Sequence, residues 1–302
     1  MNKGINLVNE YSLNNNSPIY SSCVINDEPV ICVGCLSEIV VIQQDKHKRK
    51  INNKGVNVHV SQLCGNLILV SNNFCSRIFE INDDSISIYA ELERNSSSSI
   101  IPLSHNRIAV YSKNNYNSIV NIYNSNTFEL IVGLYYAKGK YTNTNEDYCL
   151  IQLHNKEILV CVPFNNNTLQ IWDLQTYQLI TVFNDIYCCS SHSVTEIYNK
   201  SLLAIGNIGC ITIINTLTWT IEQTIAHNSI QYVYIYSVIS SEHFLFSGDN
   251  NGSIHYFNIN TWELINSYNY IHNGSINCLA ITKDNKHLLS GSSDGVIKVW
   301  SI

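Results

Sequence analysis

The stretch Leu289-Ser290-Gly291-Ser292-Ser293-Asp294-Gly295-Val296-Ile297-Lys298-Val299-Trp300 decides the fold of this 302-residue chain. His272 precedes Ser290 by eighteen residues, Asp294 follows Ser290 by four, and Trp300 lies six further on. In a four-stranded antiparallel sheet, this spacing brings imidazole, hydroxyl, carboxylate and indole N–H into one hydrogen-bonded row. Each group satisfies another that would otherwise be buried without a partner, at a cost of about 1–3 kcal/mol apiece. The spacing therefore predicts a β-sheet held by a structural tetrad.

A strand that ends in a short turn, with Thr followed by an aromatic residue, recurs along the chain. The copies are Ile122–Phe128, Ile171–Tyr177, Ile213–Trp219 and Tyr256–Trp262. Their Thr residues lie 49, 42 and 43 positions apart, close to the period of about 40–45 residues that is typical of propeller blades. The runs between them alternate and are rich in β-branched residues, which excludes helical solenoids of similar period.

The segment around the tetrad resembles a WD40 repeat, and the resemblance sets the expected fold. We expect an all-β, seven-bladed WD40-like β-propeller formed by a single domain. The blades are predicted at about 17–53, 55–92, 95–138, 145–185, 190–228, 229–273 and 275–302 plus 5–12. The N-terminal strand Ile5–Ser12 is expected to complete the last blade, which hides two strand edges that would otherwise promote aggregation.

Composition narrows the class of partner and the compartment. Only 13% of residues are charged and the net charge is −6, which argues against a nucleic-acid binder because such proteins need a basic face. The first residues contain no apolar signal segment, and no apolar run is long enough to cross a bilayer. We therefore expect a cytoplasmic protein, with the nucleus as the other compartment, and interpret most of the eleven cysteines as small buried hydrophobes.

Two constellations contain the residue types of catalytic or metal sites. His272, Ser290 and Asp294 match a nucleophilic triad, and Gly291–Gly295 fits the pattern Gly-x-Ser-x-Gly. That pattern belongs on a strand–turn–helix elbow, whereas strands are expected on both sides here, so a scaffold is favoured over a catalyst. Cys32-Val33-Gly34-Cys35 lacks a second cysteine pair at matching distance and is interpreted as core. The sequence thus predicts no catalytic residue, no metal site and no cofactor.

The densest basic run is Lys46-His47-Lys48-Arg49-Lys50, with Lys54 nearby. We place residues 46–54 on the turn between the third and outer strands of the first blade and interpret them as a solvated tip. The alternatives are an acidic partner, a nuclear-import signal or a phosphoinositide headgroup. Phosphopeptide recognition is disfavoured because the chain has only four arginines, all before residue 108.

The resemblance implies a non-catalytic platform for protein–protein interaction, or an adaptor subunit of a larger hetero-complex. Its partners would be proteins or peptides, not nucleic acid. We place the contact face on the loops that join outer to inner strands and second to third strands. The candidate contacts are Tyr141, His192, His227, Asn228, Asn251, His272 and Asn273. The alternatives are an enzyme with its site at the mouth of the propeller channel, and a membrane-surface adaptor that acts through residues 46–54.

Overall fold

The structure is a computed structural model of the chain. It describes residues 5–13, 17–25, 30–35, 38–43, 47–52, 59–64, 66–72, 75–82, 86–93, 99–114, 117–135, 148–154, 156–163, 168–184, 186, 190, 192–197, 199–226 and 233–302. Within these ranges all regular elements are β-strands, β1 to β28, arranged in four-stranded sheets. None of the described segments is a helix long and apolar enough to cross a membrane.

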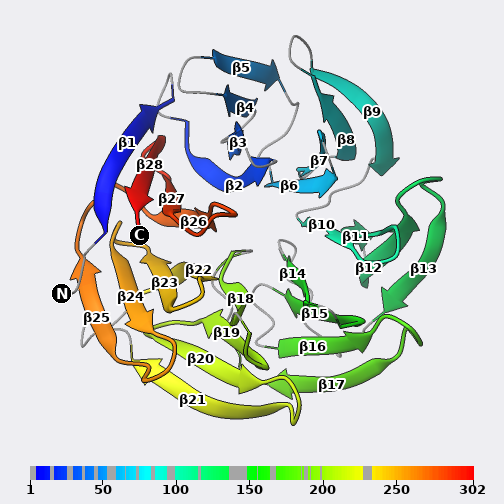
Figure 1. Cartoon of the computed structure of the whole chain (residues 1–302). Coiled ribbons are helices and arrows are strands. Elements are labelled where there is room, and N and C mark those ends of the chain that lie inside the picture. The colour runs from blue at the N-terminus through cyan, green and yellow to red at the C-terminus, as the bar shows by residue number, and fades with distance from the viewer. Residues whose placement is uncertain are drawn as a thin grey trace. The chain divides into compact units, whose positions relative to one another are not determined.

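The chain divides into two compact units, and the first comprises Met1–Ser21 and Phe183–Ile302. It contains three antiparallel sheets of four strands each (Figure 1). The first sheet comprises β18 (Val194–Ile197), β19 (Leu202–Gly206), β20 (Cys210–Asn215) and β21 (Thr220–Ala226). The second comprises β22 (Ile235–Ser240), β23 (Phe244–Asp249), β24 (Ile254–Asn258) and β25 (Leu264–Tyr268). The third comprises β26 (Ile276–Ile281), β27 (His287–Ser292), β28 (Val296–Ser301) and β1 (Asn6–Ser12).

The second unit, Ser22–Val182, contains four sheets, apart from the first residues of β2 and the last of β17. Its first sheet comprises β2 (Ile19–Ile25), β3 (Val30–Cys35), β4 (Glu38–Gln43) and β5 (His47–Asn52). The next comprises β6 (His59–Cys64), β7 (Leu67–Ser71), β8 (Ser76–Ile81) and β9 (Ile86–Glu93). The third comprises β10 (Ile100–Leu103), β11 (Arg107–Asn114), β12 (Asn117–Asn124) and β13 (Leu130–Tyr135). The fourth comprises β14 (Tyr148–Gln152), β15 (Ile158–Pro163), β16 (Thr168–Asp173) and β17 (Leu179–Asn184).

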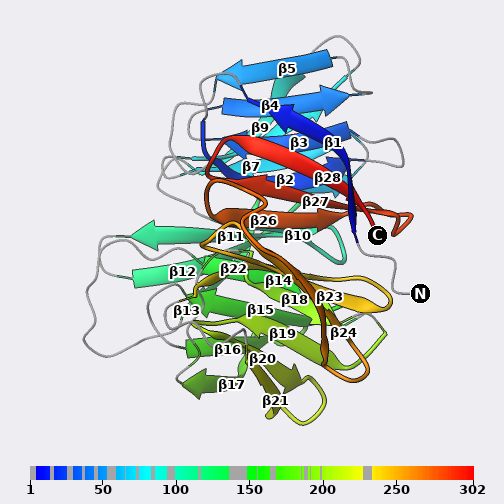
Figure 2. The same ribbon diagram turned by 90° about the vertical axis from the view of Figure 1, so that its left-hand side faces the viewer.

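The described residues thus form seven four-stranded sheets in the predicted order along the chain. The strands of each sheet lie inside the corresponding predicted range, except that β9 ends one residue beyond it, at Glu93. Strand β1 pairs antiparallel with β28, from Asn6 opposite Ser301 to Ser12 opposite Val296, and both views show the two strands side by side (Figures 1 and 2). The predicted closure of the last sheet by an N-terminal strand is confirmed.

The placement of the basic run on a turn is wrong. His47–Asn52 forms strand β5, which pairs with all of β4 from Glu38 opposite Asn52 to Gln43 opposite His47. A run of Lys, His and Arg suggests a solvated loop, but the fourth strand of a sheet is an edge strand, where charged residues are typical because they oppose edge-to-edge aggregation. Lys46 and residues 53–54 lie outside the described residues.

Apolar side chains fill the space between neighbouring sheets of the same unit. Strands β16 and β19 are buried along nearly their whole length, because each lies inside a sheet whose two faces are both covered. The outer strands β17 and β21 are exposed or half-buried at almost every residue. The core between the sheets β10–β13 and β14–β17 includes Tyr111, Ile122, Leu159 and Trp172.

Glycines near the ends of second strands let the next sheet approach closely. A β-carbon on Gly248 would lie 2.5 Å from Cγ2 of Ile276, the first residue of β26, closer than real β-carbons approach other atoms. Equivalent pairs are Gly206 with Ile235 at 2.6 Å and Gly291 with Ile19 at 2.8 Å. The isoleucine that begins a sheet therefore packs into the space left by a missing side chain of the sheet before it.

The repeated Thr–aromatic segment is a defined turn. In the copy before β25, Asn258 Oδ1 accepts hydrogen bonds from the backbone N–H groups of Asn260 (2.8 Å) and Thr261 (3.3 Å), and Trp262 N–H donates to Asn258 O at 2.8 Å. Trp262 has φ 60°, and φ is 59°, 58° and 54° at Phe128, Tyr177 and Trp219. Such a φ is rare for a bulky residue, and the ring of Trp262 compensates by packing on the apolar core.

Candidate functional site

The four residues of the predicted tetrad lie in one hydrogen-bonded row within the last sheet. His272 Nε2 is 2.8 Å from Ser290 Oγ, and His272 Nδ1 is 3.1 Å from Asp294 Oδ2. Trp300 Nε1–H donates to Ser290 Oγ at 3.0 Å. The Ser290 hydroxyl is therefore held between the imidazole and the indole, and the whole residue is buried.

The electrostatics of the row indicate a structural role. Burial lowers the pKa of His272 more than Asp294 raises it, so the imidazole is neutral at neutral pH. Burial would raise the pKa of Asp294, but His272 and backbone N–H groups hold it below its ordinary value. Those N–H groups belong to Asn273 (2.8 Å) and Val296 (2.9 Å). The side chain of His272 has 0% exposure, so His272 is not a surface contact for a partner.

The preceding sheet contains a second polar row that the sequence reasoning missed. His255 Nδ1 is 2.7 Å from Ser267 Oγ, and His255 Nε2 is 3.3 Å from Asp249 Oδ2. Asp249 Oδ1 also accepts from the backbone N–H groups of Asn251 and Ser253, both at 2.9 Å. The carboxylate thus comes from the last residue of strand β23. It lies two residues before Asn251, which follows β23 as Asp294 follows β27. The signal was present as the Asp249 that precedes a turn rich in Asn and Gly.

The remaining residues of the predicted contact face are only partly described. Asn251 and Asn273 are exposed. His192 is half-buried, and its backbone carbonyl accepts from Val238 N–H at 2.9 Å. The other candidates, Tyr141, His227 and Asn228, lie outside the described residues. Of the seven candidates, Asn251 and Asn273 are the exposed residues that the structure describes.

A pocket of about 740 Å³ lies on the turns between first and second strands, not on the loops where the contact face was predicted. It forms where the first and second strands join, at the turns of the neighbouring sheets β10–β13 and β14–β17. Its apolar wall includes Ile101, Leu150 and Ile151, and its polar wall comes from the two turns. A concave apolar surface with a few convergent polar groups is typical of a binding site.

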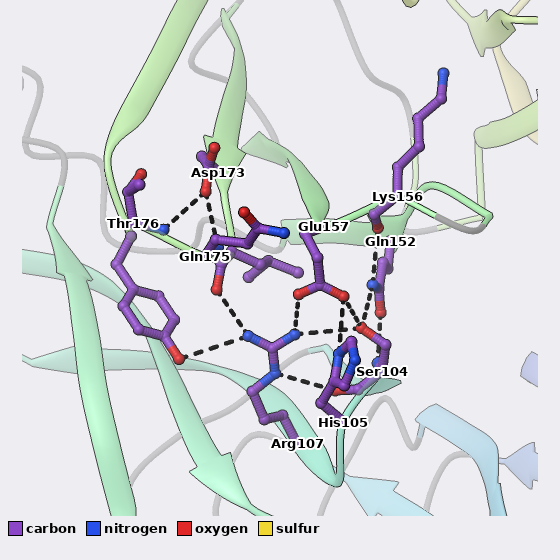
Figure 3. A network of polar contacts seen from close by, with 11 residues as sticks. Ser104, His105, Arg107, Gln152, Lys156, Glu157, Asp173, Gln175 and Thr176 are labelled. Atoms are coloured by element: carbon purple, nitrogen blue, oxygen red, sulfur yellow. Dashed lines mark hydrogen bonds and ion pairs between the residues drawn. The ribbon is translucent and has the colours of Figure 1, made fainter.

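Arg107, the first residue of β11, organises the polar wall (Figure 3). Its Nε–H donates to Ser104 O at 3.0 Å, and its Nη2 donates to Ser104 Oγ at 3.2 Å and to a carboxylate oxygen of Glu157. Its Nη1 reaches the next sheet, where Leu174 O accepts at 2.7 Å and the Tyr177 hydroxyl lies at 3.5 Å. A buried guanidinium that is fully hydrogen-bonded fixes the geometry of both turns.

Ser104 is the second centre of the network. Its backbone N–H donates to Gln152 Oε1 at 2.7 Å, and its hydroxyl accepts from Gln152 Nε2 at 2.7 Å and donates to Glu157. Gln152 Nε2 also donates to Lys156 O at 2.9 Å, and His105 Nδ1 is 3.0 Å from Glu157 Oε1. A nucleophilic serine needs an imidazole on its hydroxyl, whereas the described contact of His105 is to Glu157. The arrangement therefore suits binding rather than hydrolysis.

The Arg107–Glu157 pair is charged at neutral pH. Burial would raise the pKa of Glu157, but hydrogen bonds from Ser104 and Arg107 and the nearby positive charges hold it below its ordinary value. Burial would lower the pKa of Arg107, and the contact with Glu157 raises it instead. In the part of the chain that the structure describes, no group of three or more His, Cys, Asp or Glu side chains is placed to hold a metal ion.

Consecutive four-stranded meanders with apolar cores between neighbouring sheets define an all-β propeller fold. The family model for the WD40 repeat (WD domain, G-beta repeat) matches residues 262–301, which span β25 to β28. This match and the arrangement of the sheets support a WD40-type propeller, as the resemblance predicted. A search of curated proteins found no match. Propellers of this type generally mediate protein–protein interaction and are typically not enzymes.

Proposed function

We propose that this protein is a non-catalytic interaction platform that recognises another protein through the pocket between the turns of the sheets β10–β13 and β14–β17. The observation that carries the proposal is the combination of an apolar wall with a polar wall fixed by Arg107 and Glu157. A site that is rigid before binding loses little conformational entropy when a partner docks. The same rigidity leaves Ser104 and Glu157 hydrogen-bonded to each other rather than available for catalysis.

We further propose that the seven sheets close into a single ring and that the protein works as a subunit of a hetero-complex. The pairing of β1 with β28 supports a closed ring, since it joins the N-terminal and C-terminal segments of the chain in one sheet. A cytoplasmic setting, with the nucleus as the alternative, is part of the same proposal. It is supported by Cys75 and Cys161, which are buried and form no disulfide.

Affinity purification of the tagged full chain from its native cells, followed by mass spectrometry, tests the proposed function. Ile101 and Ile151 line the pocket and are half-buried, so Ile101→Thr/Ile151→Thr keeps the strand-favouring branched shape and makes the wall polar. Ile131→Thr/Ile180→Thr is the matched control, because these two isoleucines lie exposed on the outer strands of the same two sheets.

We expect the control to retain the partners of the wild-type protein and the pocket variant to lose them while a melting scan shows that it is still folded. An identical set of partners for both variants would remove the pocket from the proposal. If the wild-type chain co-purifies with no protein, the platform function itself is wrong.

A further inference from the structure

Two pockets, not one, flank the turn between β10 and β11. The second has a volume of about 420 Å³ and lies between the sheets β6–β9 and β10–β13. Its walls include Leu63, Leu67 and Tyr89, and Tyr89 packs edge-on against Phe128 at 6.1 Å between ring centroids. Both pockets are lined by Pro102, Leu103 and His105. They are therefore neighbours on one edge of these sheets, separated by a single turn.

The turn between the two pockets is a fixed ridge. His105 and Asn106 have φ 57° and 53°, a left-handed pair that makes the chain reverse tightly. The His105 side chain is 76% exposed, yet its Nδ1 is held 3.0 Å from Glu157. Ser104 and Arg107 anchor the base of the turn through their hydrogen bonds. The ridge is thus ordered before any partner arrives.

The charged groups around the ridge leave one net positive charge. Lys156 and Arg107 line the two pockets against one carboxylate, Glu157, and Arg107 is paired with that carboxylate. Arg107 already holds Glu157 and two backbone carbonyls, so its guanidinium does not present the open fork that bidentate phosphate recognition uses. The Lys156 side chain extends away from this network (Figure 3). The local excess of positive charge favours a carboxylate in the partner.

We propose that the two pockets and the ridge bind an extended segment of a partner protein that carries two apolar side chains and an Asp or Glu. In an extended chain, alternate residues point to the same side, so two apolar side chains on that side can enter the two pockets while the backbone crosses His105. The acidic side chain lies at Lys156. This inference rests on the proposed function and specifies which kind of partner the pocket takes.

A library of random linear peptides displayed on phage, panned on the full chain, tests the inference. We expect enriched peptides to share two apolar positions and an acidic one, with synthetic fluorescein-labelled copies binding in an anisotropy titration. Lys156→Glu should weaken binding roughly fivefold to tenfold, and a peptide with Lys at the acidic position should recover it. Lys286→Glu is the matched control, because Lys286 is 75% exposed on the corresponding turn of the last sheet, and it should bind like the wild type.

The other outcomes separate the inference from the proposed function. Enriched peptides without an acidic position, or a clear gain in affinity when phosphoserine replaces the acid, would overturn carboxylate recognition. Binding that Ile101→Thr/Ile151→Thr leaves unchanged would remove the pockets from both proposals. If no peptide binds while the pocket variant still loses co-purified partners, the platform stands and the extended-segment inference is wrong.

Discussion

Replacing Arg107 by methionine tests how far the polar wall depends on one buried charge. Methionine fills much of the volume of the arginine stem but removes every guanidinium hydrogen bond. The side chains of Arg107 and Glu157 are 9% and 18% exposed, so the substitution leaves a mostly buried carboxylate without its cation. Removing one partner of a buried ion pair costs about 3–5 kcal/mol. Ser104 and His105 still contact Glu157, which places the expected loss near the lower end, at about 3 kcal/mol.

Urea unfolding monitored by circular dichroism measures this loss, and a melting scan should show a fall of roughly 5–10 °C. Arg77→Met is the matched control. Arg77 lies 3.8 Å from Glu91 in a more exposed pair, with side chains 25% and 34% exposed, and at that distance we expect the pair to contribute about 0–1 kcal/mol. A loss at Arg107 no larger than the loss at Arg77 would refute the claim that the buried pair fixes the pocket wall.

The double variant Arg107→Met/Glu157→Gln separates charge burial from lost packing. Without the carboxylate there is no uncompensated buried charge, so we expect the double variant to be more stable than Arg107→Met alone. The pKa of Glu157 is lowered in the folded protein. Its stabilising contribution is therefore complete above the ordinary pKa of about 4.3 and is lost as the pH falls through the lower folded value. Glu157→Gln should accordingly reduce the fall in stability below about pH 4. If stability falls below about pH 4 as steeply as in the wild type, Glu157 does not contribute in this way.

Gly248→Ala should destabilise the protein by about 1–3 kcal/mol in urea unfolding, because its β-carbon would lie 2.5 Å from Ile276; a neutral result would show that the two sheets can separate freely. Asp294→Asn should cost about 2 kcal/mol. The pKa of His272 is lowered by burial, so stability in melting scans should fall as the pH drops below about 6.5, and His272→Asn should remove that slope. Asn258→Ala should cost about 1 kcal/mol, since two backbone N–H groups lose their acceptor, whereas Asn258→Asp keeps the acceptor and should stay near wild-type stability.

The sheet order was predictable because it depends on a periodic signal. The Thr–aromatic segments recur at intervals of 49, 42 and 43 residues, and each copy ends a third strand. The spacing from His272 to Trp300 located the polar row for a similar reason, since each member has a fixed position relative to the strands β26 to β28. Alternation also identified Ile5–Ser12 as the segment that completes the last sheet, and β1, Asn6–Ser12, pairs there with β28. The charged segment His47–Asn52 was wrongly predicted as a turn, because an edge strand can have the composition of a loop.

The candidate site could not be predicted in the same way. Arg107 and Glu157 are fifty residues apart and belong to different sheets, so no local spacing relates them. A scarce arginine that directly precedes an apolar strand is a weak sign of a buried cation. In the next sheet, Arg107 donates to the backbone carbonyl of Leu174. Every residue has a backbone carbonyl, so the sequence does not indicate this acceptor. Only the packing of one sheet on the next reveals such a contact.

The repeated turn has a second role, because its backbone carbonyl accepts a hydrogen bond from a cation of the preceding sheet. Leu174 and Ile259 occupy the same place in two copies of the turn, directly after the Asx residue. Arg107 donates to Leu174 O at 2.7 Å, and Lys200 donates to Ile259 O at 2.6 Å and lies 5.7 Å from the centroid of the Trp262 ring. In both cases a cation from the first turn of one sheet binds the third turn of the next. The element common to both is the backbone carbonyl acceptor. Arg107 adds a hydrogen bond to the Tyr177 hydroxyl, whereas Lys200 lies over the Trp262 ring. In these two places a cation and a carbonyl hold one sheet to the next, and neither contact involves the hydrogen-bonded row of the last sheet.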